Sequence, residues 1–235
     1  KIDSESRKTK IKLNELSYGS FDQRNLSISS KITGDKVNSI LGFSNNNSDG
    51  YRHNTDYKKN NYFIKSVIEN GDHPIELITS FTENKFGANG FYASPSATEQ
   101  YEETQSSLVG LTMSIFSEKL VLKPKIYWRR GQDEYIYIRD NPSVYRNLHI
   151  TNKISAELSG SYFSNLGMTG FGLDMSSYNI SSNNLGEHSR KTINLFFDHQ
   201  FKAFNEKLVL SPGISISHFS DMSWHSFPGI DLGID

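Results

Sequence analysis

The stretch Leu120-Val121-Leu122-Lys123-Pro124-Lys125-Ile126-Tyr127-Trp128-Arg129 decides the fold, because its side chains alternate in character with a period of two. Leu120, Leu122, Pro124, Ile126 and Trp128 fall on one face, and Val121, the two lysines, Tyr127 and Arg129 fall on the other. The same alternation recurs near 75–82, 109–115, 193–202 and 208–217. Each segment predicts a β-strand of about ten residues with one apolar and one polar face.

Composition narrows the class of protein. The chain has 235 residues, a net charge of -1, no cysteine and only 35% hydrophobic residues, which is low for a globular protein. A near-neutral chain carries no field that would recruit nucleic acid. The seven histidines are scattered, and there is no G-x-S-x-G segment and no glycine-rich nucleotide loop. We therefore expect no enzyme, no cofactor, no metal site and no nucleic-acid partner.

The predicted connections alternate between short and long. We expect strands near 10–18, 24–32, 36–45, 60–69, 75–84, 103–116, 120–130, 147–162, 168–180, 190–203, 208–218 and from about 225. The expected short turns are Thr33-Gly34-Asp35, Asn70-Gly71-Asp72, Ser117-Glu118-Lys119, Asn165-Leu166-Gly167 and Asn205-Glu206-Lys207. The expected long loops are 46–59, 85–102, 131–146 and 181–189. This alternation puts all long loops at one end of the sheet, as in outer-membrane barrels.

Two further features favour a membrane barrel over a soluble β-protein. Phe116, Phe163 and Phe204 each precede a short turn, which predicts a ring of phenyl groups at one membrane interface. The polar face carries charged residues that a small soluble barrel would not hold inside. They are Lys123, Lys125, Arg129, Asp174, Asp198 and Lys202. The fold class predicted is an all-β, antiparallel transmembrane β-barrel of the bacterial outer membrane, with its apolar face toward lipid.

The long loops supply the candidate ligand-binding residues. These are Tyr51, Arg52, Asn54, Asp56 and Tyr57 in loop 46–59, and Phe86, Asn89, Phe91 and Tyr92 in loop 85–102. Aromatic and amide groups at the outer mouth recognise a ligand by stacking and hydrogen bonding. The alternative is that the Asn, Asp and Gly residues only turn the loops and that the rings pack on one another.

Two other sets of residues have a competing structural explanation. The Arg129-Arg130 pair, with Tyr135 and Tyr137, could attract an anionic ligand or could anchor the barrel in lipid headgroups. Asn45, Asn47, Asp49 and Asp56 supply hard oxygen ligands of the kind that bind calcium, but their spacing does not match an EF-hand.

Several segments resemble TonB-dependent receptors, especially the cobalamin-receptor-like group from Bacteroidetes. They are Ser48-Asp49-Gly50-Tyr51-Arg52-His53-Asn54-Thr55-Asp56-Tyr57, Lys85-Phe86-Gly87-Ala88-Asn89-Gly90-Phe91-Tyr92, Tyr127-Trp128-Arg129-Arg130 and Tyr18-Gly19-Ser20-Phe21. The resemblance covers most of the chain and implies a 22-stranded barrel filled by a plug. It also implies that the barrel is embedded in outer-membrane lipid and takes up a small nutrient, with TonB driving the uptake. Cobalamin is the nutrient that the resemblance favours.

This sequence departs from that family's pattern, because no plug and only eleven or twelve strands are expected between Lys1 and Asp235. Unpaired strand edges are costly in lipid. We therefore expect residues 1–235 to be part of one barrel domain, with the plug and the remaining strands outside this chain. The open alternatives are a ferric siderophore or haem receptor, a complete smaller barrel acting as a passive channel, adhesin or enzyme, and a soluble carbohydrate-binding β-protein.

Overall fold

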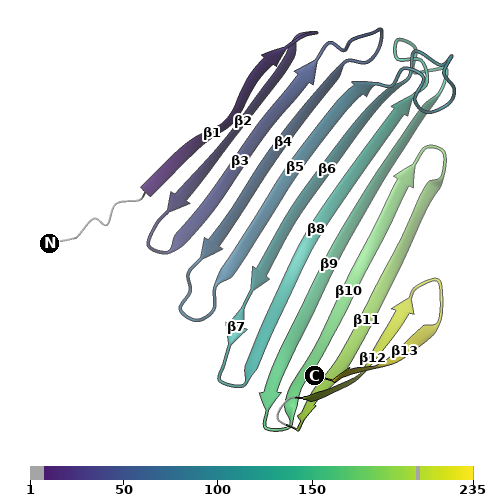
Figure 1. Cartoon of the computed structure of the whole chain (residues 1–235). Helices are drawn as coiled ribbons and strands as arrows, with labels where there is room; N and C mark the ends of the chain where they lie inside the picture. The colour runs from purple at the N-terminus through teal and green to yellow at the C-terminus, as the bar shows by residue number, and fades with distance from the viewer. Residues whose placement is uncertain (1–7, 205–206, 235) are drawn as a thin grey trace.

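The computed structural model describes residues 8–204 and 207–234, and it is a single antiparallel β-sheet. Apart from the two-residue strand β7, which pairs with β8 beside β6, each strand pairs with its neighbour in sequence, so the sheet is a meander (Figure 1). The strands are β1 Lys8–Gly19, β2 Gln23–Thr33, β3 Val37–Ser48, β4 Tyr57–Ile68, β5 Ile75–Gly87, β6 Tyr101–Met113, β7 Ile115–Phe116, β8 Leu120–Ile136, β9 Arg146–Ser164, β10 Gly167–Ser182, β11 Gly186–Ala203, β12 Leu208–Phe219 and β13 Trp224–Ile234. The prediction of an all-β antiparallel fold is confirmed.

The described residues contain no helix that is long and apolar enough to cross a membrane.

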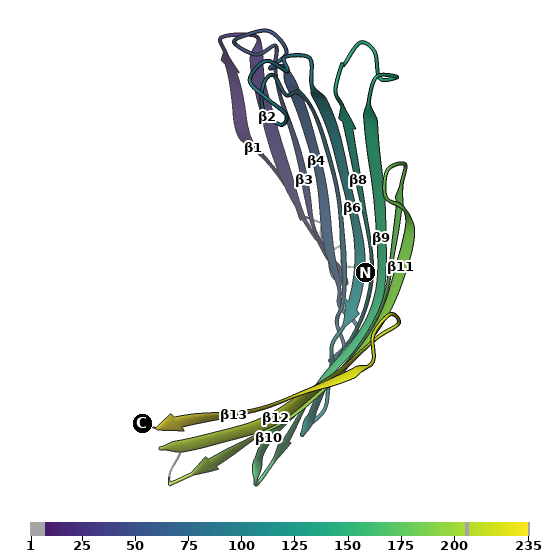
Figure 2. The same ribbon diagram turned by 90° about the vertical axis from the view of Figure 1, so that its right-hand side faces the viewer.

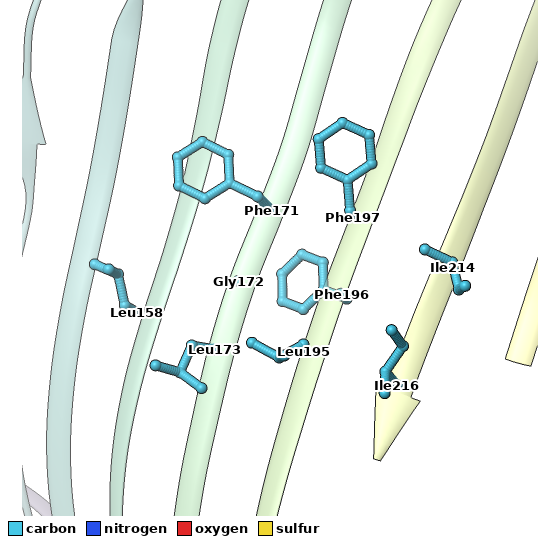
Figure 3. Close-up of a pocket in the computed structure, with 9 residues that line it drawn as sticks. All are labelled: Leu158, Phe171, Gly172, Leu173, Leu195, Phe196, Phe197, Ile214 and Ile216. Carbon is cyan, nitrogen blue, oxygen red and sulfur yellow. The ribbon is translucent and has the colours of Figure 1, made fainter. Parts of the chain in front are cut away.

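The strand register puts the two kinds of side chain on opposite faces of the sheet, as predicted. Ile126 lies opposite Leu111 on β6 and Ala156 on β9, whereas Lys125 lies opposite Thr112 and Glu157. Since directly opposed residues share a face, the apolar set continues from strand to strand across the whole sheet. Figure 3 shows part of it, where side chains of β9 to β12 line a hollow of about 360 Å³. They include Leu158, Phe171, Leu173, Leu195, Phe197 and Ile214.

The polar face is the concave one. The sheet curves strongly along its strands (Figure 2), and curvature crowds the side chains on its inner side. Ser155, Ser176, Thr192 and Ser217 are buried although no second layer covers the described sheet, and the register places all four on the polar face. Hydrogen bonds stabilise this face, since the Asp174 carboxylate accepts from the Ser155 and Ser176 hydroxyl groups and from the Asn194 amide.

The sheet has no packed apolar interior. In the described residues, the only buried apolar side chains are Ala88, Ala97 and Ile136, all at the end of the sheet that bears the long loops. Leu120 and Leu122 are half-buried and Ile214 is exposed. Because a soluble β-sandwich would seal such residues in a core, the apolar convex face requires another apolar medium to cover it.

The loop prediction needs one correction. Long loops connect β3 to β4, β5 to β6 and β8 to β9, as expected. The predicted long loop 181–189 is wrong, because β10 and β11 stay paired up to Ser182 opposite Gly186. The Ser182 hydroxyl accepts hydrogen bonds from the backbone of Asn184 and Leu185 and so stabilises this tight turn. Short and long connections therefore do not alternate strictly, since this end also carries tight turns.

The predicted aromatic ring is also wrong in its placement. Phe116 lies opposite Val121, and Val121 lies opposite Ser161, so these residues are on the concave face. Phe163 is on that face too, two residues beyond Ser161 on β9. Phe204 is exposed in the turn between β11 and β12, and Asn205 and Glu206 of this turn lie outside the described residues. Proximity to a short turn did not reveal which face each ring occupies.

An aromatic row does exist on the convex face, nearer the long loops. Phe43, Tyr62 and Phe81 are opposed on β3, β4 and β5, with ring centroids 5.2 and 6.2 Å apart. Two residues farther toward the loops, Asn45 donates to Asn60, and Asn60 donates to Glu83. The convex face thus changes from apolar to aromatic to polar, which is the order expected across a membrane interface.

Candidate functional site

Three long loops meet at one end of the sheet and form the candidate site. They comprise residues 49–56, 88–100 and 137–145, and Figures 1 and 2 show them gathered above β3 to β9. The backbone already joins them, since the Asn89 amide donates to the carbonyl of Asn54 and the Arg139 amide donates to the carbonyl of Glu99. The loops therefore form one cap over the strand ends.

Arg139 holds the three loops together. Its guanidinium donates to both carboxylate oxygens of Asp56, at 2.6 and 2.9 Å, and to the side-chain oxygen of Asn54 at 3.1 Å. It also lies 4.5 Å from the ring centroid of Tyr101, in cation–π geometry. A bidentate arginine–carboxylate pair is directional, so this contact fixes the orientation of each loop as well as its distance. We call this set the Arg139 clasp.

Amide side chains make the remaining crossings. The Asn54 amide donates to the carbonyls of Thr98 and Gln100, at 2.8 and 2.6 Å. The Asn89 amide donates to the carbonyl of His53 at 2.6 Å. Asn54 has a positive φ of 50°, a conformation that asparagine tolerates better than most residues. These residues satisfy backbone groups of neighbouring loops and so set the shape of the cap.

Aromatic side chains collect on the concave side of the cap. Phe91 contacts Tyr92 edge to face at 4.8 Å between ring centroids, Tyr92 contacts Tyr135 at 5.5 Å, and Tyr135 contacts Tyr145 at 6.2 Å. We call these four residues the mouth cluster. Tyr135 opposes Glu102 in the register, and Glu102 hydrogen-bonds the Tyr92 hydroxyl. Burial, and then this hydrogen bond, raises the pKa of Tyr92 well above its usual range, so its hydroxyl stays protonated.

Comparison with known proteins supports the architecture. No protein-family model matches the sequence, and no curated protein matches it. Solved structures do match. The copper transporter OprC aligns with a TM-score of 0.68 and 10% identity, over 96% of this chain and 41% of that one. The siderophore receptor PirA from Pseudomonas aeruginosa aligns with a TM-score of 0.71 and 8% identity, over 95% and 39%.

A third match, the FrpB iron transporter from Neisseria meningitidis, has a TM-score of 0.69 and 11% identity, over 92% of this chain and 42% of that one. The chain has the fold of part of a TonB-dependent receptor barrel. It spans less than half the length of these solved structures. At such low identity the likeness establishes the fold alone.

In this sheet the predicted site residues divide into two groups. Asn54, Asp56 and Asn89 build the cap through the contacts above, so turn and loop packing explains them. Phe91 and Tyr92 belong to the mouth cluster. The others are placed as follows: Tyr51 is exposed with Arg52 beside its ring at 5.3 Å, Tyr57 donates to Asn46, and Phe86 opposes both Tyr57 and Glu102 on the concave face.

Three important residues were not among the candidates of the sequence. Arg139 was not predicted as a site residue. The sequence shows only that it is a cation in one long loop and that another long loop contains the acidic residue Asp56. Tyr135 was considered only with the arginine pair, and Tyr145 was not considered. Their contacts depend on how loops 49–56, 88–100 and 137–145 fold against one another, which local sequence does not specify.

The strand register also separates Arg129 from Arg130. Arg129 opposes Lys153 on the concave face, whereas Arg130 is on the convex face and donates to Gln132. Two of the four oxygen ligands considered for calcium are likewise engaged elsewhere, since the side-chain oxygen of Asn45 accepts from the Asn47 amide and the Asp56 carboxylate binds Arg139. Among the described residues, no group of three His, Cys, Asp or Glu side chains is placed to hold a metal ion.

The Arg139 clasp predicts a defined response to acid. Arg139 lowers the pKa of Asp56 through its hydrogen bonds and charge. Because the pKa of Asp56 is lowered, its contact with Arg139 stabilises the clasp fully at pH values above the ordinary aspartate pKa of about 3.9. That stability is lost only as the pH falls through the lower folded value. We expect carboxyl ¹³C shifts to give an Asp56 pKa below about 3.9 that returns near it in Arg139→Gln. A pKa of Asp56 that is identical in both proteins would contradict the clasp.

Proposed function

We propose that this chain forms part of the barrel wall of a TonB-dependent outer-membrane receptor that takes up a metal complex or another small nutrient. The observation that carries the proposal is the pair of faces: an apolar convex face with an aromatic border, and a polar concave face beneath a loop cap. This pattern suits a wide barrel with lipid outside and a hydrated lumen inside.

Siderophores and metals are the ligand class that we favour. The similar structures carry the names copper transporter, siderophore receptor and iron transporter. Cobalamin, the first expectation from the sequence resemblance, has no specific support from these matches. The partners in this proposal are the nutrient, TonB acting through a plug, and outer-membrane lipid.

The mouth cluster is the proposed contact for the nutrient. Exposed aromatic rings on a loop that the Arg139 clasp fixes in place offer rigid apolar area at a low entropic cost. Tyr51, Arg52, Tyr57 and Phe86 are proposed as further contacts at the rim and just beneath it. Asn54, Asp56 and Asn89 act by holding the loops that present them.

Uptake by cells that express the full-length protein tests the proposal. We expect accumulation of one supplied ligand, among copper, ferric siderophores and cobalamin, to require TonB and to stop with a proton uncoupler. The double substitution Phe91→Ala with Tyr92→Ala should raise the ligand concentration that gives half-maximal uptake about tenfold. This is equivalent to a loss of about 1.4 kcal/mol of binding free energy. The matched control is Phe204→Ala, which removes an exposed ring at the opposite end of the sheet. Uptake that persists without TonB would refute the proposal and favour a passive channel.

A further inference from the structure

Two cations face each other directly on the concave wall. The register of β8 and β9 places Arg129 opposite Lys153, and both belong to the polar face. Directly opposed side chains have Cβ atoms about 5 Å apart, and like charges at that spacing are destabilising. Within the described part of the chain, neither residue has an ion pair with a carboxylate.

Two nearby cations on the same face are neutralised by carboxylates. Lys125, two rows toward the short turns, forms an ion pair with Glu157. Arg190, on β11 in the same row as Lys153, forms one with Asp221. The wall therefore supplies carboxylates for the cations on either side of the pair and leaves the positive charge of Arg129 and Lys153 uncompensated.

Lys153 is held in place by two tyrosines. Its ammonium nitrogen lies 5.0 Å from the ring centroid of Tyr127 and 4.9 Å from that of Tyr178. Rings on both sides restrict a side chain that would otherwise sample many rotamers, so little further entropy is lost when the ammonium binds an anion. Arg129 is exposed beside it and presents a planar set of N–H donors that matches carboxylate and phosphate oxygens.

We propose that Arg129 and Lys153 form an anion-binding site on the lumen wall for a small solute carrying carboxylate or phosphate groups. The inference rests on the proposed function, and it adds a ligand class and a second binding position. The pair lies six residues down β8 from Tyr135, about 20 Å below the mouth cluster. A solute released from the cap would meet these two positive charges on its way down the wall.

The sequence provides a closely matched control. Arg130 has the same charge and the next position on β8, but it lies on the convex face. The full-length protein in detergent is titrated calorimetrically with pyrophosphate and with tricarballylate, a tricarboxylate. We expect Arg129→Gln and Lys153→Gln each to weaken binding at least fivefold, Arg130→Gln to leave it unchanged, and Arg129→Lys to restore most of it.

Two outcomes overturn the site. The first is equal binding by wild type, Arg129→Gln and Arg130→Gln. The second is no binding by wild type. If the melting temperature then also falls more for Arg129→Gln than for Arg130→Gln, a carboxylate of the same protein occupies the pair. This assay needs no TonB, so loss of TonB-dependent uptake with intact anion binding would refute the proposed function and leave the site standing.

Discussion

Ile64→Arg is expected to destabilise the assembled barrel by about 1–2 kcal/mol, between the cost of arginine at the membrane interface and its cost at the bilayer midplane. Ile64 is on the convex face of β4, opposite Leu41 and Thr79 and one step below the aromatic row. Its side chain has no carboxylate opposite it to neutralise a new charge. The measurement is urea unfolding of the full-length protein in lipid vesicles, followed by tryptophan fluorescence.

Phe63→Arg is the matched control for this prediction. Phe63 is the preceding residue, has nearly the same exposure as Ile64 (36% against 38%), and is on the concave face opposite Gly42 and Ser80. In a hydrated lumen the new charge keeps its water, so we expect a change below about 1 kcal/mol. Equal destabilisation by the two substitutions, or a larger effect of Phe63→Arg, would contradict the assignment of the faces.

Arg139→Met is expected to release the loop cap while leaving the sheet assembled. It removes the bidentate contact with Asp56, the bond to Asn54 and the contact with the Tyr101 ring. The pair is about 37% exposed, so we discount its worth for solvent screening and expect a total of about 1–2 kcal/mol. That corresponds to about 5- to 30-fold faster hydrogen exchange at loop amides.

The amides to follow are those of Gly87 and Ala88, which donate to the carbonyls of Asp56 and Gln100. The control is Arg146→Met, which breaks an exposed pair with Glu134 on the outer surface and should change these rates less than twofold. Similar acceleration by both substitutions would show that the cap does not depend on Arg139.

Strand positions and faces were predictable because they depend on a short-range rule. A period of two holds wherever one face meets an apolar medium and the other meets water, and the paired register then extends it across the sheet. The segment from Leu120 to Trp128 was therefore sufficient to predict the faces of β8, and the same rule predicted the faces of β12. The loop at 181–189 was misjudged because its polar residues resemble a loop, whereas the register keeps β10 and β11 paired to their tips.

The site was predictable only in part, for a different physical reason. Aromatic residues in long loops indicated Phe91 and Tyr92, since exposed rings are unusual on a hydrated surface. Arg139 lies 83 residues from Asp56 in sequence, Tyr145 lies across a loop from Tyr135, and only the folded loops bring each pair together. Charge and aromatic content also could not separate Arg129 from Arg130, because adjacent residues of a strand differ only in the face that they occupy.

The most direct test is a scan of single cysteines along β11, in a sequence that has no cysteine of its own. Cysteines at positions 193 to 198 in the full-length protein are labelled with a fluorophore in lipid vesicles, and quenching by brominated lipid is compared with quenching by aqueous iodide. We expect positions 193, 195 and 197 to respond to brominated lipid, and 194, 196 and 198 to respond to iodide. Quenching that does not alternate, or that alternates with the opposite phase, would contradict a wall with lipid on its convex face and water on its concave face.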